Sequence, residues 1–205
     1  MDFSCQVYED SDPDQSKFEE MVELPPCEIG KLSTIADVVT HSLQTLIQRQ
    51  NIALAIEQEG YIPKLLELFH MCEDVENVEG LHHLYDTFKA LFLVNQPALL
   101  SIMLQEDTIM DVIGCLEWDP SKPEPFKHRE YVQSKVTFHE VIPIQNPELV
   151  AKIHLLYKVL YIQEVILPTP SVFEENVMAA LKAFVQFAKT DIVSGLQVGK
   201  ASSVN

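Results

Sequence analysis

Apolar residues in this chain recur at intervals of three and four positions, and this spacing constrains the fold more than any other feature. It places them on one face of an α-helix, whereas a half-buried β-strand would alternate apolar and polar residues. Strict alternation is rare, and only six glycines occur in 205 residues. The pattern therefore predicts an all-α fold in which each helix buries one stripe. The clearest stripes lie within 29–39, 52–56, 62–72 and 81–92.

Two later helices have start signals. Asn146, Pro147 and Glu148 offer a cap, a first-turn proline and an acid that the helix dipole favours. Ser171 and Glu174 have the spacing of a capping box. The helix that opens at Pro147 is apolar on two sides, which predicts a central helix packed between neighbours.

The sequence contains a weak internal repeat with a period of 47 residues. Four apolar positions at 62, 65, 66 and 69 recur as apolar positions at 109, 112, 113 and 116, and positions 52–59 recur at 99–106. A period of roughly 40–47 residues is typical of armadillo and HEAT arrays. In the phrase EGYIPKLLELF (59–69), a glycine ends one helix and Ile-Pro opens the next, where the first N–H groups lack intrahelical partners. We therefore expect an armadillo/HEAT-like α-solenoid.

The charge balance restricts the partners. Apolar residues make up 47% of the chain and charged residues 22%, which is typical of a folded protein. The net charge of −17 should repel nucleic acid and anionic lipid, so neither is expected as a partner. Residues 1–24 hold eight acids and one base and are predicted to be a disordered acidic leader. We expect the helical domain over 25–197 and a disordered tail over 198–205.

The cysteines and the hydropathy pattern bear on localisation. Cys5, Cys27, Cys72 and Cys115 lie far apart and form no CxxC pair, and no secretory signal is visible. Both features favour reduced thiols in the cytosol or nucleus. No apolar run reaches the roughly 18 residues that a membrane span needs.

The stretch HMCEDVENVEGLHHLY (70–85) is the first candidate site. Cys72 falls on an apolar stripe, as a small buried residue would. His82 and His83 are adjacent, so they leave a helix about 100° apart, whereas zinc sites use spacings that bring ligands together. The simplest interpretation is an interhelical corner with a contact surface, in which Asp86 could hold the His82 imidazole. The enzyme alternative is a metal hydrolase built on His70, Cys72, His82 and His83, which elemental analysis would test.

The second candidate site is a break in the helical pattern from about residue 117 to 146, which contains WDPSKPEPFKHRE. Trp118, the single tryptophan, either caps the repeat core or anchors a partner. Lys127, His128 and Arg129 form a basic island near the start of a short helix, either as a solvated face or where an acidic partner or loop docks. Charge reversal at Lys127 and Arg129 is expected to weaken partner binding without unfolding the domain.

Signatures of catalysis are missing from the sequence. It contains no GxSxG, GxxxxGK[ST] or GxGxxG motif, and no carboxylate pair stands out by its spacing. We therefore assign no catalytic, cofactor-binding or metal-binding residues. The candidate partner-binding residues are Trp118, Lys127, His128, Arg129, His82 and His83.

Several long phrases resemble one known family. EGYIPKLLELFHMCEDVENVEGLHHLY, IMDVIGCLEWDP, KHREYV, EVIPI, YIQEVILPTPSVFEEN and the LPPCEIGKL opening are similar to the SMEK domain of protein phosphatase 4 regulatory subunit 3, the SMEK/Falafel family. The resemblance covers about residues 24–197. It implies an armadillo-like domain in a non-catalytic subunit that joins the phosphatase 4 catalytic subunit and regulatory subunit 2. It further implies serine/threonine dephosphorylation in the nucleus, centrosome and cytoplasm, including DNA-damage responses.

The chain also departs from that family. Family members carry an EVH1-like domain before the SMEK domain and further helical repeats after it, and neither is visible here. We therefore keep the alternative of a truncated paralogue that no longer binds the phosphatase or competes with full-length subunits. A solenoid cut after residue 197 is expected to expose an apolar face that another repeat would cover.

Overall fold

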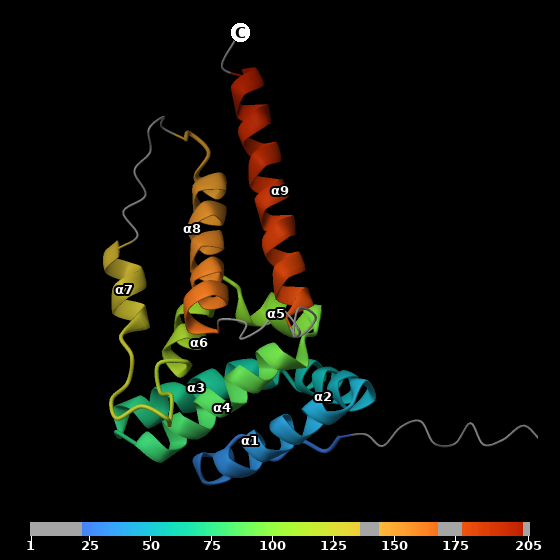
Figure 1. Ribbon diagram of the computed structural model, residues 1–205, viewed down its shortest axis with the longest axis vertical. Helices are drawn as coiled ribbons and strands as arrows, with labels where there is room; N and C mark the ends of the chain where they lie inside the picture. The colour runs from blue at the N-terminus through green and yellow to red at the C-terminus, as the bar shows by residue number, and fades with distance from the viewer. Residues whose placement is uncertain (1–21, 136–143, 168–177, 203–205) are drawn as a thin grey trace, which may run out of the picture.

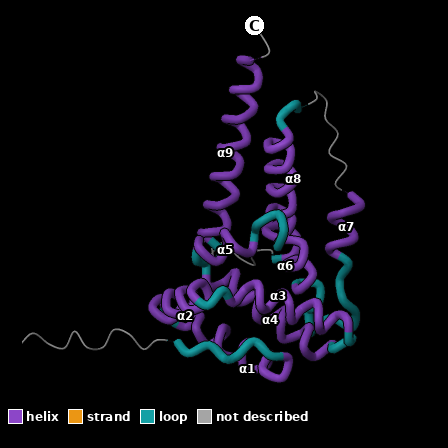
Figure 2. The backbone as a smooth tube through the Cα atoms, turned by 180° about the vertical axis from the view of Figure 1, so that it is seen from behind, coloured by secondary structure: helices purple, strands orange, loops and turns teal. Residues whose placement is uncertain are grey.

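The computed structural model describes residues 22–135, 144–167 and 178–202 of the chain. Within these ranges the regular secondary structure is entirely helical (Figures 1 and 2). None of the helices found there is both long enough and apolar enough to span a membrane. The predicted all-α class is confirmed.

Two three-helix units build the lower body of the molecule in Figure 1. The first unit consists of α1 (Leu32–His41), α2 (Leu46–Gln58) and α3 (Tyr61–Asp74), with 3₁₀ turns on either side of α1. The second unit consists of α4 (Val78–Val94), α5 (Pro97–Met103) and α6 (Ile109–Cys115).

Equivalent helices of the two units pack on each other. Helix α1 contacts α4, α2 contacts α5, and α3 contacts α6. This is the packing of successive repeats in a solenoid, where each repeat buries its apolar face against its neighbour. This packing also explains the internal repeat of 47 residues. Ile62 and Phe69 of the first unit and their counterparts Ile109 and Leu116 of the second unit are all buried. The predicted solenoid-like architecture is confirmed.

Local signals set several helix boundaries, and two of them, the corner at Gly60 and the cap at Asn146, were predicted from the sequence. Gly60 has a φ of 56° at the corner between α2 and α3, a conformation that costs glycine little, and Pro63 lies in the first turn of α3. The Asn77 side chain caps α4 by accepting a hydrogen bond from the Gly80 N–H at 3.0 Å. Asn146 caps α8 (Pro147–Tyr161) by accepting from the N–H groups of Glu148 and Leu149.

Three further helices stand above this body. Helix α7 (His128–Lys135) contacts α6, and α9 (Ala179–Ser202) contacts α5 at its base. Helices α8 and α9 lie side by side in both views (Figures 1 and 2). The residue that follows α4 fixes the base of α9, because Asn95 Oδ1 accepts a hydrogen bond from the Ala180 N–H at 2.8 Å.

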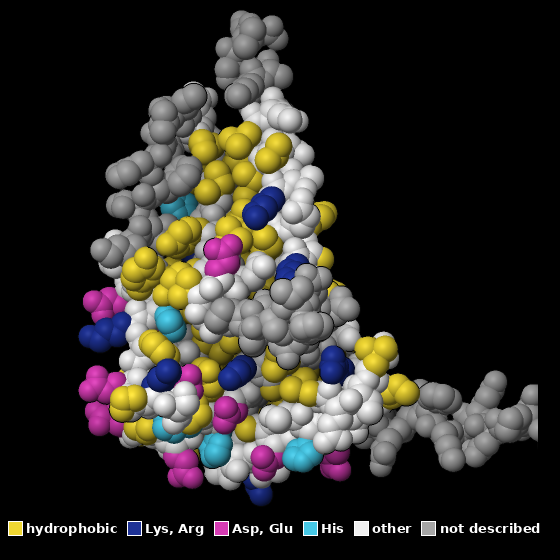
Figure 3. Space-filling model, viewed as in Figure 1, with side chains coloured by type: hydrophobic (Ala, Val, Ile, Leu, Met, Phe, Trp, Pro, Cys, Tyr) yellow, Lys and Arg dark blue, Asp and Glu magenta, His cyan; other side chains and the backbone are white. Residues whose placement is uncertain are grey.

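Helix α8 corrects one prediction. Its two apolar sides predicted a central helix packed between neighbours, yet only Leu149 and Val159 are buried within it. Its other apolar side chains, Leu155 and Leu156 among them, are partly exposed because α9 covers one side only. After Tyr161 the helix widens into a π-helical turn, Ile162–Ile166, closed by the Leu167 N–H bonding to the Ile162 carbonyl at 2.8 Å. Figure 3 shows the resulting hydrophobic surface over α8 and α9.

The folded part of the chain extends past the predicted domain boundary at each end. Leu24, placed in the acidic leader by the sequence, is buried in the core, and the Tyr61 hydroxyl donates a hydrogen bond to the adjacent Pro25 carbonyl. Helix α9 runs to Ser202, past the boundary predicted at residue 197. The capping box predicted at Ser171 and Glu174 lies outside the described residues.

Candidate protein-interaction surface

The segment from Glu117 to Arg129 forms a loop whose two ends are tied together. The Phe126 N–H donates to the Glu117 carbonyl at 2.8 Å, and the Arg129 N–H donates to Glu117 Oε1 at 2.7 Å. Glu117 follows the end of α6 and is buried, whereas residues 120–127 are exposed. The chain therefore projects a closed loop, 118–127, from a buried base.

Arg129 fastens this base to the body. Its Nε donates to Glu117 Oε2 at 2.8 Å, and its Nη1 donates to Glu73 Oε2 at 3.1 Å, at the end of α3. The guanidinium also lies 5.3 Å from the centre of the Phe69 ring. Gly114 makes this approach possible, because a Cβ there would lie 2.7 Å from Phe69 Cζ and 3.0 Å from Arg129 Cζ. We call the group Arg129, Glu117 and Glu73 the arginine clamp.

The arginine clamp corrects the expectation for charge reversal. Charge reversal at Lys127 and Arg129 was predicted not to unfold the domain, yet the Arg129 side chain is only 29% exposed and pairs with two carboxylates of its own chain. Reversing its charge would leave the buried Glu117 carboxylate facing another acid, which costs stability. The interpretation in which the basic island marks a docking acidic loop describes Arg129 better. Its role in partner binding stays a prediction.

Lys127 and His128 differ from Arg129. The Lys127 side chain is 82% exposed, with Glu130 as its nearest carboxylate at 3.8 Å. His128 is half-buried, and its Nδ1 lies 2.9 Å from the Tyr161 hydroxyl of α8. Burial lowers the pKa of His128. Lys127 is thus the member of the basic island most available to a partner.

Aromatic rings surround His128 and join α7 to α8. Phe126 stacks on the imidazole with ring centres 4.9 Å apart, and Tyr131 stacks on Tyr161 at 5.4 Å. Phe126 and Tyr131 are 41% and 46% exposed, so this cluster is also part of the surface. The sequence analysis did not single out these rings, since they come from three separate segments.

Trp118 lies at the start of the loop and packs against the core as a partly buried side chain. Its indole N–H is buried and meets no acceptor among the described residues. Of the two interpretations, the position fits a cap on the repeat core. A partner contact by its exposed part stays a prediction.

The next residue brings the loop to α4. Asp119 accepts hydrogen bonds from the Ser121 N–H at 2.9 Å and from the Tyr85 hydroxyl. Burial opposes ionisation, but these hydrogen bonds outweigh it and lower the pKa of Asp119. Burial and, to a lesser extent, the Asp119 charge together raise the pKa of Tyr85 to about 12. The loop therefore rests on one face of α4.

One of the two candidate histidines shares that face of α4. His82 lies one helical turn before Tyr85, and both His82 and His83 are half-buried. Burial raises the pKa of Asp86, although Lys89 and the two histidines oppose the shift. No hydrogen bond joins His82 to Asp86 in the described part of the chain, so the contact suggested by their spacing is not formed. The structure thus places His82 on the face of α4 that the loop touches through Asp119 and Tyr85.

The residues of the metal-hydrolase alternative are separated. Cys72 is fully buried beside Gly80, while His70 is exposed and its Nε2 lies 3.1 Å from Asp111 Oδ2 on α6. Within residues 22–135, 144–167 and 178–202, no three His, Cys, Asp or Glu side chains are grouped as metal ligands would be. Elemental analysis is still the test of that alternative.

Comparison with known proteins assigns the family. The sequence profile of "Phosphatase 4 regulatory subunit 3" matches residues 34–201, which include every helix from α2 to α8. The chain belongs to the phosphatase 4 regulatory subunit 3 family. The resemblance of its long phrases to this family is thereby confirmed.

Two relatives show how far the similarity extends. The chain is 46% identical over 205 residues to serine/threonine-protein phosphatase 4 regulatory subunit 3 of Drosophila melanogaster, covering 96% of this chain and 21% of the fly protein. It is 38% identical over 176 residues to protein PPP4R3C1 of Mus musculus, covering 86% of this chain and 22% of the mouse protein. The chain thus spans about a fifth of the length of these relatives. No solved structure matches it.

Proposed function

We propose that this member of the phosphatase 4 regulatory subunit 3 family is a non-catalytic regulatory or scaffold subunit that helps to assemble or target protein phosphatase 4. Its partners would be the catalytic subunit and regulatory subunit 2. The observation that carries the proposal is the family match over residues 34–201, most of which the structure folds into stacked helices. Such arrays bind partners along extended surfaces.

The loop 118–127 is the proposed contact within this scaffold. Its exposed tip carries prolines at 120, 123 and 125, which leave the free loop less conformational freedom to lose on binding. The arginine clamp holds its base, and Lys127 and Phe126 face solvent. The loop is preorganised and holds two lysines and two acids, whereas the whole chain has a net charge of −17, so the loop is where an acidic surface of a partner is repelled least.

The proposal places dephosphorylation chemistry, and any metal ions that it needs, in the catalytic subunit. It places this chain in the nucleus and cytoplasm, including the centrosome. Imaging of a tagged chain beside the phosphatase 4 catalytic subunit would test the location. Separate distributions in all compartments would contradict this part of the proposal.

The first experiment is a pull-down of this chain with purified phosphatase 4 catalytic subunit, with and without regulatory subunit 2, at physiological salt. Co-purification is expected. If a chain shown to be folded by circular dichroism binds neither subunit, the scaffold proposal is overturned. The alternative of a paralogue that no longer binds the phosphatase is then favoured. Displacement of a full-length subunit from the complex would indicate a competitor.

Matched variants can then test the loop. The double variant Lys122→Glu/Lys127→Glu reverses two exposed charges on the loop and spares the arginine clamp. Its control is Lys31→Glu/Lys64→Glu, which makes the same charge change at two exposed lysines away from the loop, in the 3₁₀ turn before α1 and on α3. Weaker binding by the loop variant alone would support the assignment, and equal binding by both variants would remove the loop from the interface.

A further inference from the structure

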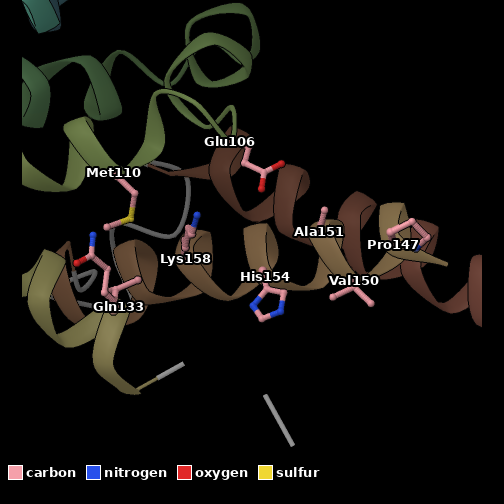
Figure 4. A pocket seen from close by; sticks show the side chains of 9 residues that line it. Glu106, Met110, Gln133, Pro147, Val150, Ala151, His154 and Lys158 are labelled. Carbon is pink, nitrogen blue, oxygen red and sulfur yellow. The ribbon is translucent and has the colours of Figure 1, made fainter. Parts of the chain in front are cut away.

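Two grooves on the described surface differ in the charges around them. The first lies between α6, α7 and α8 (Figure 4), and its lining holds one lysine, Lys158, and one glutamate, Glu106, so it favours neither sign of charge in a ligand. The second has a volume of about 430 Å³ and lies between the segment 27–29 and α3. Acids outnumber bases around this second groove, so its charge can be matched to one class of partner.

The second groove, which we call the α3 groove, has two walls. Residues 27, 28 and 29 form one wall, and residues 64, 67, 68 and 71 of α3 form the other. The α3 positions recur at steps of three and four, so they lie along one face of the helix. Leu68 is buried in this face, whereas Met71 is 49% exposed. The groove therefore offers an apolar side chain to a ligand.

The apolar face continues beyond the groove. The Val75 N–H donates to the Met71 carbonyl at 3.2 Å, which places Val75 one helical turn after Met71. Val75 is 66% exposed, and Val78, at the start of α4, is 46% exposed. Leu68, Met71 and Val75 thus form an apolar row, 68–75, that is open at its end. Exposed apolar side chains that are grouped in this way are typical of binding surfaces.

Carboxylates surround the apolar row. Residues 22–31 and 61–79, which form the groove and the corner after it, contain seven acids and two bases, and the whole chain is acidic as well, with a net charge of −17. Glu28 and Glu67 come from opposite walls, and neither forms an ion pair with another described residue. The base in the lining, Lys64, donates from Nζ to the Glu59 carbonyl at 2.8 Å. The two carboxylates are therefore available to a basic ligand.

The corner after α3 adds a carboxylate in an uncommon backbone conformation. Glu76 has a φ of 54°, and the Asn77 N–H donates to the Cys72 carbonyl at 2.9 Å, as in a Schellman motif, where the left-handed position is usually glycine. The chain thus carries an exposed glutamate directly after Val75, where glycine would be less strained. Strain of this kind is a reason to look for a role of the side chain in function.

We propose that the α3 groove and the apolar row 68–75 bind a basic amphipathic segment of a partner protein. Its apolar side chains would cover Met71 and Val75, and its lysines or arginines would pair with Glu67 and Glu76. The proposal does not depend on binding to phosphatase 4. The groove shares no lining residue with the loop 118–127, so the two surfaces are tested separately.

Three synthetic peptides test the proposal with the full chain. The probe is a fluorescein-labelled 15-residue peptide with leucines along one helical face and lysines beside them. One control replaces each leucine by serine, and the other replaces each lysine by glutamate. Fluorescence anisotropy at 0.15 M salt should show that the probe binds at least about tenfold more tightly than either control. Equal binding of the serine peptide would mean that the net charge of −17 alone attracts lysines, and would overturn the proposal.

Acid variants locate the charged contacts. Glu28→Gln/Glu67→Gln should weaken the probe about five- to tenfold, because two attractions are lost. Its control is Glu57→Gln/Asp107→Asn, which removes the same charge at two exposed acids outside the groove. Circular dichroism checks that each variant is folded. Equal affinity of the two double variants would overturn the proposal.

Apolar variants locate the row. Met71→Ser/Val75→Ser should weaken the probe at least about fivefold, because the apolar contact is lost without a change of charge. Its control is Leu46→Ser/Leu54→Ser, which changes two exposed apolar side chains of α2, 66% and 54% exposed. A Met71→Ser/Val75→Ser protein that binds the probe as tightly as wild type would overturn the proposal.

Glu76→Gly separates binding from folding. It removes the strained side chain, so the thermal unfolding temperature should be unchanged or higher, whereas the probe should bind about threefold more weakly. A merely structural role would change the unfolding temperature and leave the affinity unaltered. That result would overturn the assignment of Glu76 to the site.

Cys27 reports whether the groove is occupied. It is partly exposed in the groove wall, whereas Cys72 and Cys115 are buried. In a Cys5→Ser protein, saturating probe should slow the alkylation of Cys27 by N-ethylmaleimide about tenfold. An unaltered rate would place the probe elsewhere on the protein and overturn the proposal.

Charge disfavours two other occupants, and each has its own outcome. Residues 1–21 hold seven acids and one base, and a second copy carries the same net charge of −17, so the acids at the groove repel both. If deleting residues 2–21 speeds alkylation of Cys27 about tenfold, the leader covers the groove. If light scattering shows a dimer that the probe dissociates, a second copy covers it. Either result overturns the proposal, and a monomer with an unchanged alkylation rate supports it.

Discussion

Helices α4 and α8 have similar apolar content in sequence but differ in burial. Helix α4 buries ten of its 17 residues, whereas α8 buries two of its 15. The cause is the number of neighbours, because α1, α3 and α6 all pack on α4, while α8 packs mainly on α9. Helical periodicity therefore shows which residues can be buried, and the surrounding elements decide how many are.

Truncation of one apolar side chain in each helix should give the largest contrast. Phe88→Ala in α4 is expected to cost about 3–5 kcal/mol of unfolding free energy, because the fully buried ring leaves a cavity. Leu156→Ala in α8 should cost about 1 kcal/mol, because that side chain is only partly buried. Urea unfolding measures both, with the 78% exposed Phe187→Ala as control. Equal losses at Phe88 and Leu156 would contradict the difference in burial.

Breaking the arginine clamp should have the next largest effect. Glu117→Ala removes the buried carboxylate of Arg129 and is expected to cost about 2–3 kcal/mol, somewhat less than a fully buried pair because Glu73 still pairs with Arg129. Proteolysis within the loop 118–127 should also become faster, since its base is released. Lys127→Ala is the control and should leave both quantities unchanged. A stable Glu117→Ala with an unaltered cleavage rate would mean that the clamp does not hold the loop.

A single methyl group tests the fit beneath the clamp. Gly114→Ala should cost about 1–2 kcal/mol although alanine favours helix, because the new Cβ would lie 2.7 Å from Phe69 Cζ. Gly30→Ala serves as control, since no heavy atom lies within 4 Å of a Cβ built there. Thermal unfolding compares the two variants. A Gly114→Ala protein as stable as wild type would show that Phe69 and Arg129 shift freely.

The smallest expected effect is a pH dependence at the contact between α7 and α8. Burial lowers the pKa of His128 below its ordinary value of 6.5, so the unfolded chain binds the proton more readily. The stabilisation is therefore present above about pH 6.5 and is lost as the pH falls toward the folded-state pKa. Between pH 8 and pH 5.5, the unfolding free energy should fall more in the wild-type protein than in His128→Gln. An identical fall in both proteins would exclude His128 as the cause.

The candidate site was only partly predictable from sequence. The break at residue 117 and the basic island mark its location, but nothing in their spacing identifies Glu73 as a partner of Arg129, 56 residues away. The contact of Asp119 with Tyr85 also joins residues far apart in sequence. Such pairs depend on which helix faces meet, and local periodicity carries no information about that choice.

The helical class, the cap at Asn146 and the repeat that pairs α3 with α6 could all be predicted from the sequence. These features depend on residues within one or two helical turns, or on a pattern that is repeated in the chain. Three other features depend on tertiary packing: Asn95 caps α9, most of α8 stays partly exposed, and Arg129 pairs within the clamp. Each of these outcomes joins segments far apart in sequence, because burial and ion pairing depend on the neighbours that packing provides.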